Sequence, residues 1–188
     1  ASDDPVSLGI AGVRGLGGIG KTALAYKLAE SLASRYPDGN VFIPLYGVRP
    51  QPVAPDDALK TVLRAVLGEE ARLPEGGAAL GNCYRSALHG KRLLLLFDDA
   101  KDRAHVEPLL PPATCGVLIT SRQKFALPGL QPRDLDTLPP EDARALLLAI
   151  CPRIGALADE LARVCGCLPL ALRAAGSALA ERIDLSPA

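Results

Sequence analysis

The sequence predicts an α/β fold in which a central parallel sheet of five strands lies between two layers of helices, with a small helical subdomain after it. Two observations support this prediction. Short apolar segments alternate with segments of helical periodicity through the first two thirds of the chain, the order typical of a parallel sheet with right-handed crossovers. After Pro139-Pro140, helical segments follow one another without a strand pattern. We therefore expect an α/β domain at 1–138 and a helical subdomain at 139–188.

The elements are expected in a regular order. The expected strands lie at residues 6–11, 40–46, 93–97, 117–120 and 133–138. The expected helices lie at residues 23–32, 56–67, 78–88, 141–150, 156–164 and after Pro169. The runs at 93–97 and 117–120 are uninterrupted apolar segments, as in strands buried on both faces of a sheet. Leu24, Leu28 and Leu32 recur every four residues, so we expect them on one face of their helix.

Composition limits the classes of function. Of the 188 residues, 48% are apolar and only 4% aromatic, so the core must consist mainly of Leu, Ala, Val and Ile. Lys plus Arg equals Asp plus Glu at 21 each, which makes nucleic acid an unfavoured partner. No apolar run approaches the ~20 residues that span a bilayer, and no signal peptide is found. We expect a cytoplasmic domain without a membrane partner. Because the sequence contains no Met, we also expect it to be a part of a longer protein.

The cysteines and histidines do not form a metal-binding pattern. Cysteine occurs at an odd number of positions without the spacing of a zinc site, so we expect small buried thiols in a reducing compartment. These positions are Cys83, Cys115, Cys151, Cys165 and Cys167. His89 and His105 have no partner at metal-ligand spacing, and we expect surface or hydrogen-bonded roles for them.

Residues 15–22 read Gly-Leu-Gly-Gly-Ile-Gly-Lys-Thr, a complete G-x-x-x-x-G-K-[ST] phosphate-binding loop. The loop stands between a predicted strand and a predicted helix, which is the context the motif requires. In such a loop the main-chain N–H groups and the helix N-terminus face the phosphates. Lys21 is placed to bind the β and γ phosphates, and the Thr22 hydroxyl to bind Mg²⁺. The sequence thus predicts a P-loop NTPase of three-layer αβα architecture; the alternative is a glycine-rich turn that binds nothing.

The apolar strand at 93–97 runs directly into Asp98 and Asp99, which is the Walker B arrangement. A buried strand delivers these carboxylates to the carboxyl edge of the sheet, where ligands of open α/β folds bind. We expect Asp98 to hold Mg²⁺ directly or through a water, and Asp99 to orient or deprotonate the attacking water. The alternative is that the two acids begin a helix.

The strand at 117–120 is followed by Ser121 and Arg122 at the same predicted sheet edge. The Arg122 guanidinium is placed to sense a γ-phosphate and stabilise charge as the phosphoryl group transfers. The alternative is a solvated arginine after a strand. Adenine is the expected base, because the chain has neither the Asp-x-x-Gly and Asn-Lys-x-Asp tetrads of G proteins nor the Leu-Ser-Gly-Gly-Gln signature of transporter ATPases.

A fourth motif lies in the helical part. The segment Gly166–Leu172 (Gly-Cys-Leu-Pro-Leu-Ala-Leu), followed by Gly176 and Leu179, resembles the Gly-x-Pro motif of NB-ARC domains. Those domains belong to the STAND class of signalling ATPases. With the phosphate loop, the 93–99 strand and the 117–122 strand in the family's order, the resemblance extends from Val6 to Leu179.

The resemblance implies a molecular switch that binds ATP and ADP with Mg²⁺ and hydrolyses ATP slowly. The nucleotide contacts it implies are Gly15, Gly17, Gly18, Ile19, Gly20, Lys21, Thr22, Ala23 and Pro169. Thr22 and Asp98 would hold the metal, while Lys21, Asp99 and Arg122 would act in catalysis. Pro169 would pack against base and sugar, or simply start a helix, or do both.

The resemblance also implies a mode of regulation and partners. ADP would hold the nucleotide domain against the helical subdomain, and ATP would favour an open state that self-associates into a homo-oligomer. Sensor and effector domains of the full-length protein are the implied partners. The family's upstream Gly-Arg-Glu segment and its winged-helix subdomain with a Met-His-Asp motif are not in this sequence. A fragment without them is expected to bind nucleotide less tightly.

Two other functions compete with the switch. A small-molecule kinase with a phosphate loop would need a lid of arginines, for which Arg133, Arg144 and Arg153 are candidates. A degenerate scaffold without activity is the third, and the intact Lys21 and Asp98 argue against it.

Overall fold

The computed structural model describes residues 9–182, which form two units. Within that range the first unit comprises residues 9–15 and 21–134, and the second comprises residues 16–20 and 135–182. The division falls between Asp134 and Leu135, beside the boundary expected at 138/139. In the described part of the chain, no helix is both long and apolar enough to cross a bilayer.

The first unit contains a five-stranded sheet in the order β2-β3-β4-β1-β5, with all neighbouring strands parallel. The strands are β1 (Gly9–Arg14), β2 (Asn40–Pro44), β3 (Leu94–Ala100), β4 (Gly116–Ser121) and β5 (Leu130–Asp134). This order places β4 between β1, which leads into the phosphate loop, and β3, which carries the two aspartates. The carboxyl ends of these three strands therefore share one edge of the sheet.

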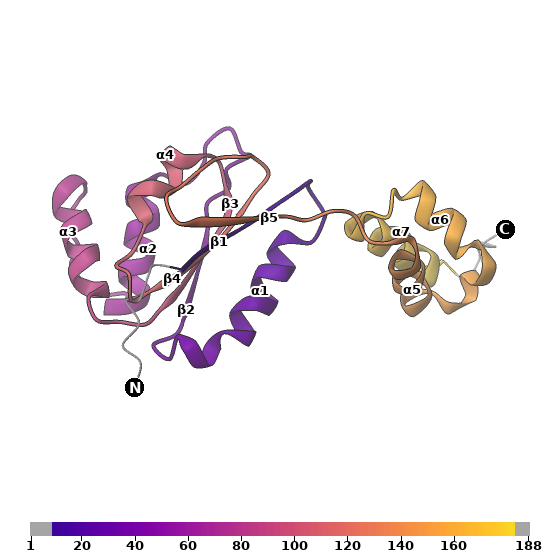
Figure 1. Cartoon of the computed structure of the whole chain (residues 1–188), viewed down its shortest axis with the longest axis horizontal. Helices are drawn as coiled ribbons and strands as arrows, with labels where there is room; N and C mark the ends of the chain where they lie inside the picture. Colours follow the sequence, from indigo (N-terminus) through magenta and orange to yellow (C-terminus); the bar gives the residue numbers. More distant parts are fainter. Residues whose placement is uncertain (1–8, 183–188) are drawn as a thin grey trace. The chain divides into compact units, whose positions relative to one another are not determined.

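Helices cover both faces of this sheet, as Figure 1 shows. They are α1 (Lys21–Ser31), α2 (Pro55–Leu67), α3 (Gly77–Leu88) and the short α4 (Arg103–Val106). Leu94 and Leu96 of β3 pack against α1, while Leu95 and Phe97 face the core shared with α2 and α3. Successive strand side chains point to opposite faces, so one continuous apolar run supplies both cores. The predicted three-layer αβα fold is confirmed.

The inner face of α1 consists of alanines rather than leucines. Its buried apolar residues are Ala25 and Ala29, whereas Leu24 is 37% exposed and Leu28 only partly buried. Alanine has little volume beyond its Cβ, so α1 packs close to the sheet through its alanines and the leucines flank the contact.

The edge strand β5 differs from the prediction, because it lies at 130–134 rather than 133–138. It pairs with β1 in a register that sets Ile10 opposite Leu130 and Arg14 opposite Asp134. The strand contains Pro132, which is tolerated because an edge strand needs ladder bonds on one side only. The strand expected at 6–11 is β1 at 9–14, and residues 6–8 lie outside the described part.

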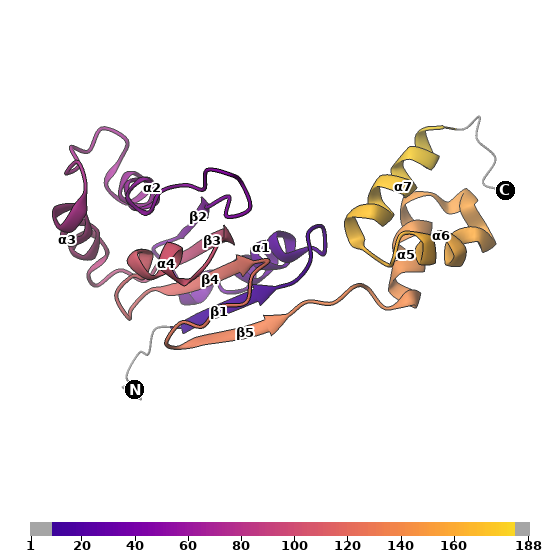
Figure 2. The same cartoon turned by 90° about the horizontal axis from the view of Figure 1, so that it is seen from above.

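The second unit is helical, with α5 (Pro140–Ile150), α6 (Ala158–Val164) and α7 (Pro169–Glu181), as Figure 2 shows. A 3₁₀ turn at Pro152–Leu157 precedes α6, where the sequence had predicted helix from residue 156. A Cβ on Gly176 of α7 would lie 3.1 Å from Ile150 of α5, so this glycine permits the close packing of the two helices. Within the same unit, the Leu170 N–H donates a 3.1 Å hydrogen bond to the Gly18 carbonyl.

The cysteines and His105 have structural surroundings. All five cysteines are free thiols; Cys115 and Cys151 are buried, and the others are half-buried. His105 is buried, with Nε2 at 2.7 Å from the Val53 carbonyl oxygen. The expectation of a hydrogen-bonded histidine is confirmed at this position.

Candidate functional site

The phosphate loop, residues 15–22, joins β1 to the first residues of α1. Gly18 and Gly20 have φ values of 78° and 99°, in the left-handed region where a side chain is strained. A Cβ on Gly20 would meet no atom within 4 Å, so backbone conformation rather than space requires glycine there. Gly17 does not have a positive φ, and Ile19 is buried.

Lys21 is the first residue of α1 and only 8% exposed. Its Nζ donates a 3.0 Å hydrogen bond to the Gly15 carbonyl. Burial lowers the pKa of Lys21, and the positive charge of Arg122 lowers it further, while Asp99 and Asp98 act in the opposite direction. A buried cation beside a second cation favours an anionic ligand, and a polyphosphate supplies that charge.

Asp98 contacts the phosphate loop directly. The Thr22 hydroxyl donates a 2.7 Å hydrogen bond to Asp98 Oδ1, so the two predicted metal ligands are adjacent. Hydroxyl and carboxylate oxygens suit Mg²⁺, and the lone pairs of the Thr22 oxygen remain available to a metal. Among residues 9–182 no group of three or more His, Cys, Asp or Glu gathers as in an all-protein metal site. The site therefore fits a Mg²⁺ that completes its shell with phosphate and water oxygens.

Both aspartates lie in β3, which excludes the alternative that they begin a helix. The next helix, α4, begins at Arg103 after Asp102. The Asp102 side chain caps it by accepting a 2.9 Å hydrogen bond from the His105 N–H.

Asp99 has a strained backbone. Its φ of 56° lies in the left-handed region, and the register between β3 and β4 shifts between Phe97 and Ala100. The Gly47 N–H donates to the Asp99 carbonyl at 2.6 Å, and the Val48 N–H approaches its carboxylate at 3.4 Å. Strain of this kind on a non-glycine residue persists only where the surroundings hold it, and it is frequent at functional sites.

Arg122 directly follows β4 and points toward Asp99. Its Nε lies 3.7 Å from Asp99 Oδ1, and its side chain is 48% exposed. An ion pair this long and exposed holds the guanidinium weakly. Arg122 therefore has freedom to turn toward a ligand at this edge, and its sensor role stays a prediction.

Thr120 is a site residue that the sequence reading missed. It is 1% exposed, donates a 2.6 Å hydrogen bond to Asp98 Oδ1, and accepts a 2.9 Å hydrogen bond from the Asp99 N–H. The sequence reading treated it only as the end of an apolar strand. Its position two residues before Arg122 was the available signal, because residues two apart share one face of a strand.

Other predicted residues lie farther along the chain. Pro169 is the first residue of α7, as the helix-starting alternative has it, and its contact with a nucleotide stays a prediction. Of the arginines proposed for a kinase lid, Arg144 pairs with Asp159 at 3.3 Å and Arg153 donates to carbonyl groups of its own unit. Arg133 is an exposed residue of β5.

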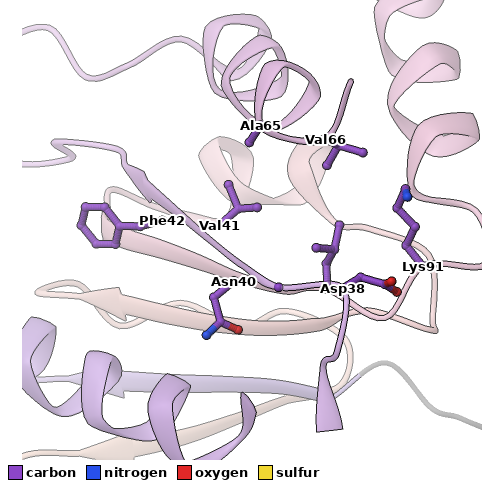
Figure 3. Close-up of a pocket in the computed structure, with 9 residues that line it drawn as sticks. Asp38, Asn40, Val41, Phe42, Ala65, Val66 and Lys91 are labelled. Atoms are coloured by element: carbon purple, nitrogen blue, oxygen red, sulfur yellow. The ribbon is translucent and has the colours of Figure 1, made fainter. Parts of the chain in front are cut away.

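A cleft of about 400 Å³ lies elsewhere in the first unit, as Figure 3 shows. Asp38 and Lys91, from the segments before β2 and β3, line it together with Val66 of α2. It lies at the amino ends of these strands, whereas Asp98 and Asp99 lie at the carboxyl end of β3. The cleft contains none of the predicted site residues.

No protein-family model matches the chain, but curated relatives are similar to it. The chain is 36% identical over 182 residues to the regulatory protein AfsR of Streptomyces coelicolor, and 37% identical to that of Streptomyces griseus. It is 28% identical over 194 residues to a probable disease resistance protein, At1g61310, of Arabidopsis thaliana. Each match covers 93% of the chain but only 18 to 20% of the relative, so the chain spans about a fifth of their length.

Two solved structures share the fold. One is a STAND protein with a tetratricopeptide repeat sensor from Pyrococcus horikoshii (TM-score 0.53, 19% identity), matched over 88% of this chain and 27% of that one. The other is the Aeropyrum pernix ORC1 protein in complex with DNA (TM-score 0.55, 17% identity), matched over 94% and 55%. The predicted resemblance to NB-ARC domains of the STAND class is confirmed. At these identities the two solved structures show only that this chain shares their fold.

Proposed function

We propose that this NB-ARC domain is an adenine-nucleotide switch within a larger cytoplasmic regulatory protein. It binds ADP and ATP with Mg²⁺ and hydrolyses ATP slowly. The observation that supports this most is the hydrogen bond from Thr22 to Asp98, because it joins the phosphate loop to a strand-borne carboxylate at the point where P-loop enzymes bind their metal.

Each residue of the site has a role in this proposal. The main-chain N–H groups of the loop, the N-terminus of α1 and Lys21 bind the phosphates. Thr22 and Asp98 hold Mg²⁺, which neutralises charge on the β and γ phosphate oxygens when bound. Asp99 orients the attacking water and accepts its proton.

Arg122 is the residue that distinguishes the two nucleotides. Only ATP carries a γ-phosphate for its guanidinium to bind, and the weak pairing with Asp99 leaves it available. A nucleotide shifts a conformational equilibrium only by its difference in affinity for the two states. In this proposal ADP favours a closed state, and ATP favours an open one that self-associates and signals through sensor and effector domains of the full-length protein.

The first test identifies the nucleotide. Purified protein is denatured and any released nucleotide is separated by chromatography, and ADP, ATP and GDP are then titrated into nucleotide-free protein by calorimetry. Adenine nucleotides are expected to bind and GDP is not; preference for GDP, or no binding at all, contradicts the proposal. Lys21→Ala should abolish binding, whereas Lys60→Ala on the surface of α2 should not.

A second test separates the ATPase from a small-molecule kinase. ATP is supplied with Mg²⁺ and no added acceptor, and free phosphate is measured over hours. Slow phosphate release that disappears in Asp99→Asn supports hydrolysis. Turnover that appears only after a small-molecule acceptor is added supports the kinase.

A further inference from the structure

We propose that Thr120 is a positioning residue whose single hydroxyl sets the geometry of both aspartates at the site. The inference rests on the proposed function for the roles of Asp98 and Asp99. Thr120 lies within the 117–122 segment, but no role was predicted for it from the sequence. In this proposal β4 aligns the carboxylates of β3.

The hydroxyl of Thr120 uses its hydrogen-bonding capacity on these two neighbours. It donates a 2.6 Å hydrogen bond to Asp98 Oδ1, and its oxygen accepts a 2.9 Å hydrogen bond from the Asp99 N–H. Because Thr120 is 1% exposed, water does not readily replace either bond if the hydroxyl is lost. One buried group thus fixes the side chain of the first aspartate and the main chain of the second.

Asp98 depends on this bond for its orientation. Its Oδ1 accepts hydrogen bonds from Thr22 at 2.7 Å and from Thr120 at 2.6 Å, two residues that lie 76 and 22 positions away in the chain. Thr22 belongs to the phosphate loop and would also bind the metal. Thr120 belongs to β4, which is buried along its whole length, so it is the contact that would keep the carboxylate in place when Thr22 engages Mg²⁺.

Asp99 depends on the Thr120 hydroxyl through its main-chain N–H. The β3–β4 register shifts at this point, so Asp99 lacks the regular ladder, and its φ of 56° must be held by other contacts. The Thr120 hydroxyl accepts its N–H, and Gly47 donates to its carbonyl at 2.6 Å. A Thr120 variant without the hydroxyl leaves the Asp99 N–H without this partner.

Arg122 directly follows β4, two residues beyond Thr120, and its Nε lies 3.7 Å from Asp99 Oδ1. A movement of this strand end on γ-phosphate binding therefore reaches Asp98 and Asp99 through the Thr120 hydroxyl. β4 thereby links the proposed sensor to the two carboxylates.

The test compares Thr120→Val, which removes the hydroxyl at nearly constant volume, with Thr120→Ser, which keeps it. Thr114→Val is the matched control, because the Thr114 hydroxyl is buried just before β4 without a hydrogen-bond partner among the described residues. Two quantities are measured on each protein. One is hydrogen exchange at the Asp99 amide without nucleotide, and the other is the ratio of ADP affinities with Mg²⁺ and with EDTA.

We expect Thr120→Val to speed Asp99 amide exchange and to reduce the Mg²⁺ enhancement of ADP affinity, each by about tenfold, with affinity in EDTA unchanged. Thr120→Ser and Thr114→Val should match the parent in both measurements. If Thr120→Val equals the parent in either, or if serine does not rescue, the inference is wrong while nucleotide binding by the parent still stands. If the parent binds no nucleotide, the proposed function fails and the role of Thr120 in it fails too.

Discussion

The Thr22 hydroxyl donates a 2.7 Å hydrogen bond to Asp98, a residue 76 positions away in the sequence. The bond connects the first turn of α1, which follows β1, to the carboxyl end of β3. In the sheet, β4 lies between β1 and β3. Two oxygen atoms of the type that Mg²⁺ prefers are thereby held side by side. Four substitutions test the site and the fold that supports it.

Asp98→Asn should remove the Mg²⁺ dependence of nucleotide binding. The amide keeps an oxygen acceptor for Thr22 but lacks the negative charge that attracts the metal. We expect ADP affinity in Mg²⁺ to fall by on the order of tenfold, toward the value in EDTA. Calorimetric titrations with and without the metal measure this. Asp159→Asn, which alters an exposed ion pair with Arg144, is the control and should leave both affinities unchanged.

Lys21→Met should abolish the stabilisation of the folded state by bound nucleotide. Burial lowers the pKa of Lys21, so the folded state binds its proton more weakly than the unfolded state does. The charged Lys21 therefore lowers the free energy of unfolding at neutral pH. This unfavourable effect becomes smaller as the pH rises through the pKa that Lys21 has in the folded state. We expect the nucleotide-free variant to melt at the same temperature as the parent or higher.

The parent should gain about 2.7 kcal/mol at ADP concentrations a hundredfold above Kd, whereas Lys21→Met should gain nothing. Thermal unfolding with and without ADP, at pH 7 and 9.5, measures both effects. A variant that ADP stabilises as much as the parent would contradict the role of Lys21.

Gly47→Ala should displace Asp99. A Cβ on Gly47 would overlap the Asp99 carbonyl oxygen and the Lys101 nitrogen, and would lie 2.7 Å from the Ala100 carbonyl carbon. Backbone atoms cannot move aside like a flexible side chain, so we expect a loss of about 1–3 kcal/mol in urea unfolding and slower ATP hydrolysis. Gly81→Ala is the control. It adds a Cβ on α3 in ordinary contact with Arg85 only, and should stabilise by about 0.5–1 kcal/mol.

Tyr84→Phe should lower stability at neutral pH and weaken its dependence on alkaline pH. The buried Tyr84 hydroxyl donates a 2.6 Å hydrogen bond to the Leu109 carbonyl, so its loss should cost about 1 kcal/mol. Burial raises the pKa of Tyr84 well above its ordinary value near 10, and nearby Cys115 adds to this.

The folded state therefore keeps this proton where the unfolded state loses it, and the stability it provides declines as pH rises above about 10. Urea unfolding at pH 7 and pH 10.5 measures the difference, which should shrink at the higher pH. Tyr26→Phe keeps the ring that stacks on Phe42 and changes an exposed hydroxyl, so it should match the parent at both values.

Much of the fold and part of the candidate site followed from contiguous segments. The apolar run before Asp98, the glycine loop before Lys21 and the helical character after Pro139 are local patterns, and β3, α1 and α5 formed close to their predicted residues. Parallel strands place their carboxyl ends at one edge, so the sequence also predicted that Asp98 and Arg122 share an edge with the phosphate loop.

Other features depended on the packing of segments far apart in the chain. The sheet order places β4 between β1 and β3, and only this order brings Thr120 against both aspartates. The left-handed backbone of Asp99 arises where β3 shifts register against β4, and α1 packs through Ala25 and Ala29 because the sheet lies close to it. Periodicity specifies which residues face inward along one element, whereas strand pairing and the close packing of side chains decide which buried groups meet.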